Sequence, residues 1–97
     1  NLLESALGRP YATFEGIDLY ETDVDKAAAI LESIVINHPF VDGNKRTGYV
    51  LMRLLLMQSG FDIIVSQDDK YTFVIEVTEG KHTIDSIKSW INQHLAK

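Results

Sequence analysis

Two helix-forming segments separated by a short break constrain the fold of this chain more than any other feature of its sequence. The first segment, residues 23–37, carries apolar side chains at the spacing of one helical face, namely Ala27, Ile30, Leu31, Ile34 and Val35. Thr22 or Asp23 can cap it, and His38-Pro39 ends it because a residue before proline is disfavoured in the helical region. The sequence therefore predicts a helix that stops at the break.

The second segment begins after the break, near Asn44, and runs to a stop at Ser59-Gly60. Its apolar residues surround most of the helical circumference, which is typical of a helix that is buried on all sides. We therefore expect a helical bundle in which this second helix is the central, buried one.

The N-terminal flank predicts two smaller elements. Residues 2–7 have helical spacing until Gly8-Arg9-Pro10 ends them. Residues 11–22 have no sustained period, contain Gly16 and predict a loop or a short hairpin. Because Leu2-Leu3-Glu4 already has the character of a helix interior, we expect a further segment ahead of Asn1.

The C-terminal flank predicts an extended connector over residues 61–65 and two more helices. Residues 66–79 favour a helix that Gly80 ends, although Tyr71 to Val77 is rich in strand formers. Thr83 can cap the last helix, whose inner stripe is Ile84, Ile87, Ile91 and Leu95. The expected fold class is mainly α, as a single domain over residues 1–97.

The composition excludes several functional classes. A chain of 97 residues has room for one domain, and without cysteine it has no disulfide, thiolate nucleophile or cysteine-bound zinc. The net charge of −5 disfavours a broad nucleic-acid surface. The longest apolar run, Tyr49 to Met57, contains Arg53 and is about half as long as a membrane span. We expect a cytoplasmic protein without a membrane segment.

The break carries the candidate functional residues. Lys45 and Arg46 stand in the first turn of the second helix, where the helix dipole already presents positive charge and ordinarily favours Asp or Glu. A bound phosphate chain would turn this repulsion into attraction, with paired hydrogen bonds from Arg46 and a point charge from Lys45. Gly43 allows close backbone approach at the same place. The alternative is that both cations extend into solvent from an exposed helix end.

Asp42 and His38 add a carboxylate and a base to this segment. Asp42 adjoins the anion site, where a carboxylate commonly holds a magnesium ion, although capping is the common role of a lone Asp there. His38 titrates near neutral pH, as a general base should, although a lone histidine is more often structural. His82 and His94 have no partners that the sequence identifies, and we interpret them as structural.

Taken together, these residues resemble the signature of the Fic/Doc family, which reads histidine, proline, phenylalanine, any residue, acidic residue, glycine, asparagine, any residue, arginine. The matching segment is His38-Pro39-Phe40-Val41-Asp42-Gly43-Asn44-Lys45-Arg46-Thr47-Gly48. The similarity extends to residues 2–7 with Arg9-Pro10 and to Glu79-Gly80-Lys81, and it is nearest to the death-on-curing (Doc) toxin branch.

The resemblance implies the Fic/Doc helical bundle and a nucleotide-dependent transferase. It implies that His38 deprotonates a hydroxyl group of a target protein and that Asp42 holds the metal. The residues implied to bind the nucleotide phosphates are Gly43, Asn44, Lys45 and Arg46. The donor implied is ATP or another nucleoside triphosphate, together with Mg²⁺.

Three residues of the segment favour different reactions of that family. Fic enzymes that transfer AMP usually carry glycine at the position of Lys45, whereas Doc relatives carry lysine and transfer a phosphoryl group. We therefore expect the terminal phosphoryl group to pass to a Ser or Thr hydroxyl. Gly43 and Pro39 are nearer the Fic pattern and keep AMP transfer open. A third hypothesis is a non-catalytic module that binds a nucleotide or phosphate.

The resemblance also implies protein partners. A Doc-type toxin modifies a target protein, for which a translation factor is a candidate, and a separate antitoxin restrains it. Many Fic proteins carry an inhibitory motif of their own, in which serine or threonine is followed after three residues by glutamate and then by glycine or asparagine. Thr72 and Glu76 have this spacing, but Val77 stands where the motif has glycine or asparagine. We expect an antitoxin segment to cover the groove beside residues 38–46, with Phe14, Ile17 and Leu19 as a candidate wall.

Overall fold

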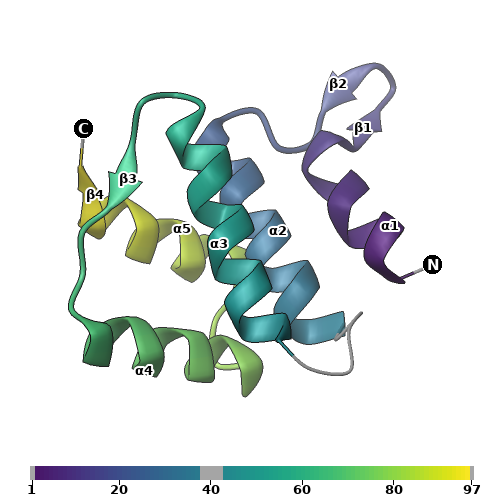
Figure 1. Cartoon of the computed structure of the whole chain (residues 1–97). Coiled ribbons are helices and arrows are strands. Elements are labelled where there is room, and N and C mark those ends of the chain that lie inside the picture. The colour runs from purple at the N-terminus through teal and green to yellow at the C-terminus, as the bar shows by residue number, and fades with distance from the viewer. Residues whose placement is uncertain (1, 38–42, 97) are drawn as a thin grey trace.

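The computed structural model describes residues 2–37 and 43–96, and these residues are mainly helical, as predicted. The helices are α1 (Leu2–Gly8), η1 (Arg9–Tyr11, a 3-10 helix), α2 (Asp23–Asn37), α3 (Asn44–Met57), α4 (Gln67–Thr78) and α5 (Ile84–His94). The short strands are β1 (Thr13–Phe14), β2 (Ile17–Asp18), β3 (Asp62–Ile63) and β4 (Leu95–Ala96). Figure 1 shows α2 and α3 side by side, with α4 and α5 below and behind them and α1 on the far side of α2.

The central helix is α2, so the expectation that the second helix would be the central one is wrong. α2 contacts α1, η1, α3, α4 and α5. Its predicted inner face is buried throughout. α3 instead buries one side and leaves Val50, Leu54 and Met57 about half exposed. Apolar residues around the whole circumference of α3 do not require that it be buried on all sides, because single apolar side chains are common on protein surfaces.

The start of α2 is fixed by a reciprocal cap. The Thr22 hydroxyl accepts a hydrogen bond from the backbone N–H of Asp25 at 3.0 Å, and the Asp25 carboxylate accepts one from the backbone N–H of Thr22 at 3.2 Å. Each satisfies a donor that has no partner within the helix. Of the two predicted caps, Thr22 is therefore the one used.

Arg9 fastens the N-terminal elements to α2. Its guanidinium forms an ion pair with Glu32 at 2.8 Å and donates hydrogen bonds to the hydroxyls of Ser33 and Tyr20, each at 2.9 Å. Pro10 is buried beside it. The Arg9-Pro10 pair therefore ends α1 and also anchors the segment that leads to the hairpin.

Residues 13–18 form the predicted hairpin, in which β1 and β2 pair antiparallel. The turn residues Glu15 and Gly16 both have positive φ, as a two-residue turn of this hand requires. The hairpin lies near the Asp23 end of α2, whereas α3 begins at the Asn37 end (Figure 1). Phe14, Ile17 and Leu19 are exposed, and the hairpin lies toward the other end of α2 from residues 43–46, the described part of the predicted site.

The C-terminal half follows the predicted order. Ser66 and Thr83 cap α4 and α5 through their hydroxyls, and α4 is a helix despite its strand-forming residues because Phe73, Val74 and Val77 are buried on one of its faces. Leu95 lies in β4 and not in the last helix, and β4 pairs with β3, the predicted extended connector. None of the helices in the described part of the chain combines the length and apolar character of a membrane span.

Candidate functional site

The described part of the predicted site is the head of α3. Gly43 is its N-cap with φ of +79°, a left-handed conformation that glycine adopts without strain. Asn44 is buried, and Lys45 and Arg46 are exposed in the first turn. His38 and Asp42, the predicted base and metal ligand, lie outside the described residues.

The first turn of α3 differs in charge from those of the other α-helices. α1, α2, α4 and α5 each carry at least one acidic residue in the first turn, as the helix dipole favours. α3 carries none there and has Lys45 and Arg46 instead. Among the described residues, neither cation forms an ion pair. Within residues 2–37 and 43–96, the head of α3 is therefore a concentration of positive charge that no ion pair compensates.

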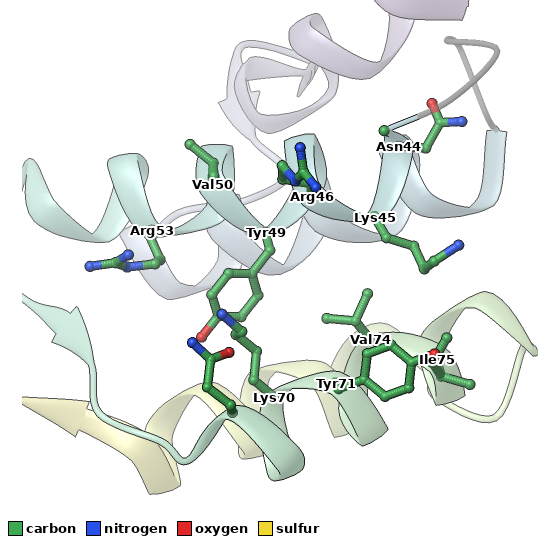
Figure 2. Close-up of a pocket in the computed structure, with 12 residues that line it drawn as sticks. Asn44, Lys45, Arg46, Tyr49, Val50, Arg53, Lys70, Tyr71, Val74 and Ile75 are labelled. Carbon is green, nitrogen blue, oxygen red and sulfur yellow. The ribbon is translucent and has the colours of Figure 1, made fainter.

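A cavity of about 480 Å³ opens beside this head, between α3 and α4 (Figure 2). One wall comes from α3 with its N-cap, and its residues are Gly43, Asn44, Lys45, Arg46, Tyr49, Val50 and Arg53. The facing wall comes from α4, and its residues are Gln67, Lys70, Tyr71, Val74 and Ile75. Volumes of several hundred cubic ångströms are typical of small-molecule sites.

Sequence reasoning missed the α4 wall of this cavity. The sequence pattern of α4 indicated only the face that packs on the core, which carries Phe73, Val74 and Val77. Lys70, Tyr71 and Ile75 lie beside Val74 along the edge of that face, since positions three and four apart are neighbours on a helix. The sequence alone did not predict that this face would lie opposite the first turn of α3.

Arg53 lines the cavity, but its charge is already paired. Its guanidinium donates two hydrogen bonds to the Asp62 carboxylate, at 2.8 and 2.7 Å. The pKa of Asp62 is lowered to about 2. The main cause is the hydrogen bonding from Arg53, and a hydrogen bond from the Ile63 backbone N–H has a smaller effect. Arg53 thus joins α3 to β3. Among the described residues, the cations of the cavity that have no carboxylate partner are Lys45, Arg46 and Lys70.

Tyr49 forms the floor of the cavity. Only 8% of the residue is exposed, and burial raises the pKa of its phenol. The Lys70 ammonium lies 5.3 Å from the centre of the Tyr49 ring, in a cation–π contact between α4 and α3. Figure 2 shows both side chains reaching across the space between the two helices.

The other histidines take structural positions, as predicted. His82 has ring nitrogens 2.9 Å from the Ser86 hydroxyl and 3.0 Å from the Glu76 carboxylate, and so links α4 to α5. The ring nitrogen Nδ1 of His94 lies 2.7 Å from the Trp90 carbonyl oxygen. Neither residue lines the cavity at the head of α3.

The described residues do not supply a metal site of their own. They contain no group of three histidine or carboxylate side chains that could hold an ion. The described lining of the cavity contains cations, two amides, two tyrosines and apolar groups but no carboxylate.

Known proteins resemble this chain in the segment that contains the site. The model of the family described as the Fic/DOC family matches residues 1–56. Toxin Doc of Mycolicibacterium smegmatis is 43% identical over 67 residues, which cover 69% of this chain and 52% of that protein.

Two more distant relatives have another activity in their names. Protein adenylyltransferase fic-1 of Caenorhabditis elegans is 40% identical over 42 residues, 43% of this chain and 8% of that protein. Protein adenylyltransferase Fic of Nematostella vectensis is 33% identical over 60 residues, 61% of this chain and 14% of that protein. The chain thus spans about half the length of the Doc relative and much less of the others. No solved structure matches the chain.

Proposed function

The chain belongs to the Fic/DOC family, and we propose that it transfers the terminal phosphoryl group of a nucleoside triphosphate, ATP in the first instance, to a Ser or Thr hydroxyl of a target protein. The observation that carries the proposal is the first turn of α3, where Lys45 and Arg46 replace the acidic residues found at the other α-helices. Both open into a cavity of suitable size for a nucleotide.

The phosphate chain would bind at this turn for electrostatic reasons. The positive end of the helix and the two side chains attract an anion, and Arg46 can donate paired hydrogen bonds to phosphate oxygens. Gly43 has no side chain that would obstruct the approach of the phosphates. The space around it is open, because no described atom lies within 4 Å of the position that a Cβ atom would take there. Charge that develops on the transferring group would be stabilised by the same cations.

In the proposed reaction, the hydroxyl oxygen of the target bonds to the terminal phosphorus while the bond from that phosphorus to the bridging oxygen breaks. The hydroxyl proton passes to the His38 imidazole, and the nucleoside diphosphate leaves with the electron pair of the broken bond. Asp42 would hold a magnesium ion through a carboxylate oxygen, and such an ion neutralises charge on phosphate oxygens.

AMP transfer is the second candidate because of two observations. Relatives named as adenylyltransferases align with part of this chain at 33–40% identity. Gly43 leaves room at the N-cap, as in the Fic pattern. In that reaction the target hydroxyl would bond to the α-phosphorus, and pyrophosphate would leave. Lys45 favours the first reaction, because it adds a cation where AMP-transferring relatives have glycine.

The proposed biological role is that of a toxin restrained by an antitoxin. It rests on the similarity to Toxin Doc over 69% of this chain. The partners proposed are a target protein, with a translation factor as candidate, and a separate antitoxin protein. The net charge of −5 does not favour binding to nucleic acid.

The test uses ATP labelled at either the α or the γ phosphate, incubated with the full-length protein and a lysate of its host. Label that reaches protein from the γ position alone supports phosphoryl transfer, and label from the α position supports AMP transfer. If neither label is transferred while ATP still binds, the non-catalytic hypothesis is correct. An Arg46→Ala variant is the control, and it should lose ATP affinity measured by calorimetry.

A further inference from the structure

We infer that Lys70 is a second phosphate-binding cation, which holds the phosphate chain from the α4 wall opposite Lys45 and Arg46. The inference rests on the proposed function, since it assumes that a nucleotide occupies the cavity between α3 and α4. It assigns a binding role to α4, which lies outside residues 38–48, and to a side chain that no sequence pattern singled out.

The charge distribution of the cavity points to Lys70. Of the four cationic side chains in its lining, Arg53 is bound to Asp62 at 2.7 Å. Lys70 has no carboxylate partner among the described residues, although the acidic residues Asp68 and Asp69 precede it in the same helix. Its charge is therefore available to an anion that enters between the two helices.

Tyr49 holds Lys70 in a position to act. A lysine near a surface ordinarily extends its ammonium into solvent, where it is well hydrated. Here the ammonium lies 5.3 Å from the Tyr49 ring centre, and Tyr49 is itself fixed by burial. The contact directs the Lys70 side chain across the cavity from α4 toward α3 (Figure 2). Tyr49 is thus a positioning residue for Lys70.

The spacing along α3 suits a chain of linked phosphates. Tyr49 follows Lys45 by four residues, which corresponds to about 6 Å along a helix axis. A ligand that contacts both Lys45 and the cation over Tyr49 must therefore carry negative charge over about one helical turn. The three linked phosphates of a nucleoside triphosphate extend over such a length, whereas a single phosphate group is shorter.

The experiment measures binding of ATP, of inorganic triphosphate and of adenosine to the full-length protein by calorimetry. The Lys70→Met variant should bind ATP and triphosphate about tenfold more weakly or worse, as expected when a charged hydrogen-bond donor is lost. Adenosine affinity should stay within twofold. Lys70→Arg should restore most of the ATP affinity, because it returns a cation of similar reach.

Matched variants separate this effect from general changes in charge. Lys81→Met removes an exposed lysine that pairs with Glu79 outside the cavity, and it should leave ATP affinity unchanged. Tyr49→Leu removes the ring beneath the Lys70 ammonium and should weaken ATP binding in the same direction as Lys70→Met.

Two results would overturn the inference, and neither is the same as failure of the proposed function. One is ATP affinity within twofold of the parent in Lys70→Met. The other is an equal loss of adenosine affinity, which would place Lys70 at the nucleoside end. In both cases Arg46→Ala still loses ATP binding if the proposed function is correct. If Arg46→Ala binds ATP normally, the proposed function itself is wrong.

Discussion

Gly48 of α3 faces Val35 of α2 so closely that a Cβ atom placed on Gly48 would lie 3.1 Å from Cγ2 of Val35. This is tighter than an ordinary van der Waals contact. The contact lies one turn beyond Lys45 and Arg46, so the approach of the two helices also sets where the head of α3 stands. The close packing of α2 against α3 therefore requires a glycine at position 48, within the segment that carries the proposed site.

The first prediction concerns this contact. Gly48→Val should lower the free energy of unfolding by about 1–3 kcal/mol, because added methyl groups overpack the interface between α2 and α3. Urea unfolding measures the change. A double variant with Val35→Ala should recover part of the loss, since it removes the opposing methyl groups, and strictly additive effects would refute direct contact between the two positions.

A second prediction concerns the pair of Arg53 and Asp62. The folded protein lowers the pKa of Asp62 to about 2 from a usual value of 3.8, so the pair stabilises the fold above about pH 4 and loses this effect as the pH falls toward 2. Both side chains are more than a third exposed, and the contribution should be only about 0.2–1 kcal/mol.

Asp62→Asn tests that pair. The difference in unfolding free energy between parent and variant should be present at pH 6 and should shrink between about pH 4 and pH 2. Asp18→Asn, at an exposed position in the hairpin, is the matched control for the loss of one surface carboxylate. A constant difference over the whole range would mean that the charge of Asp62 does not stabilise the fold.

A third prediction separates the proposed base from the phosphate site. His38→Ala should slow transfer by about 10²–10⁴ while ATP affinity changes little, because the histidine is proposed to act on the target hydroxyl. Single-turnover rates and calorimetry on the same preparations measure the two quantities. Unchanged turnover removes His38 from the mechanism, and a parallel loss of ATP affinity would place it at the nucleotide instead.

The fourth prediction concerns Lys45. Lys45→Gly should lose transfer of the terminal phosphoryl group, because a cation that stabilises developing charge is removed, and should gain weak AMP transfer. Lys45→Ala is the control, since it removes the charge without the added flexibility of glycine, and it should lose the first activity without gaining the second. The intact mass of the modified target distinguishes the two adducts.

The elements of this fold could be predicted from the sequence, but their arrangement could not. Caps at Thr22, Ser66 and Thr83 and the stop before Pro39 are local signals, and they gave the helices with nearly correct ends. Which helix would be central depends on packing between segments far apart in the chain. The apolar residues of α3 are compatible with either a buried or a half-exposed helix, so the sequence did not show that α2 would be the central one.

The site, too, could be predicted only in part. The head of α3 was found because adjacent cations in a first turn contradict the helix dipole, and that contradiction is visible in the sequence. The α4 wall was not found because its residues form an ordinary helical face. The proximity of Lys70 to Tyr49 arises only when α4 packs against α3. His38 and Asp42 lie outside the described residues, and their roles stay predictions.

The aromatic stack behind α4 gives the protein a spectroscopic probe of its own. Trp90 is the only tryptophan of the chain, and its ring lies 3.9 Å from that of Phe73 and parallel to it within 2°. Phe73 belongs to α4, the helix that also carries Lys70 and Tyr71. A shift of α4 on ligand binding would therefore alter the surroundings of a single intrinsic fluorophore. Titration with ATP followed by tryptophan emission would detect that movement without a chemical label.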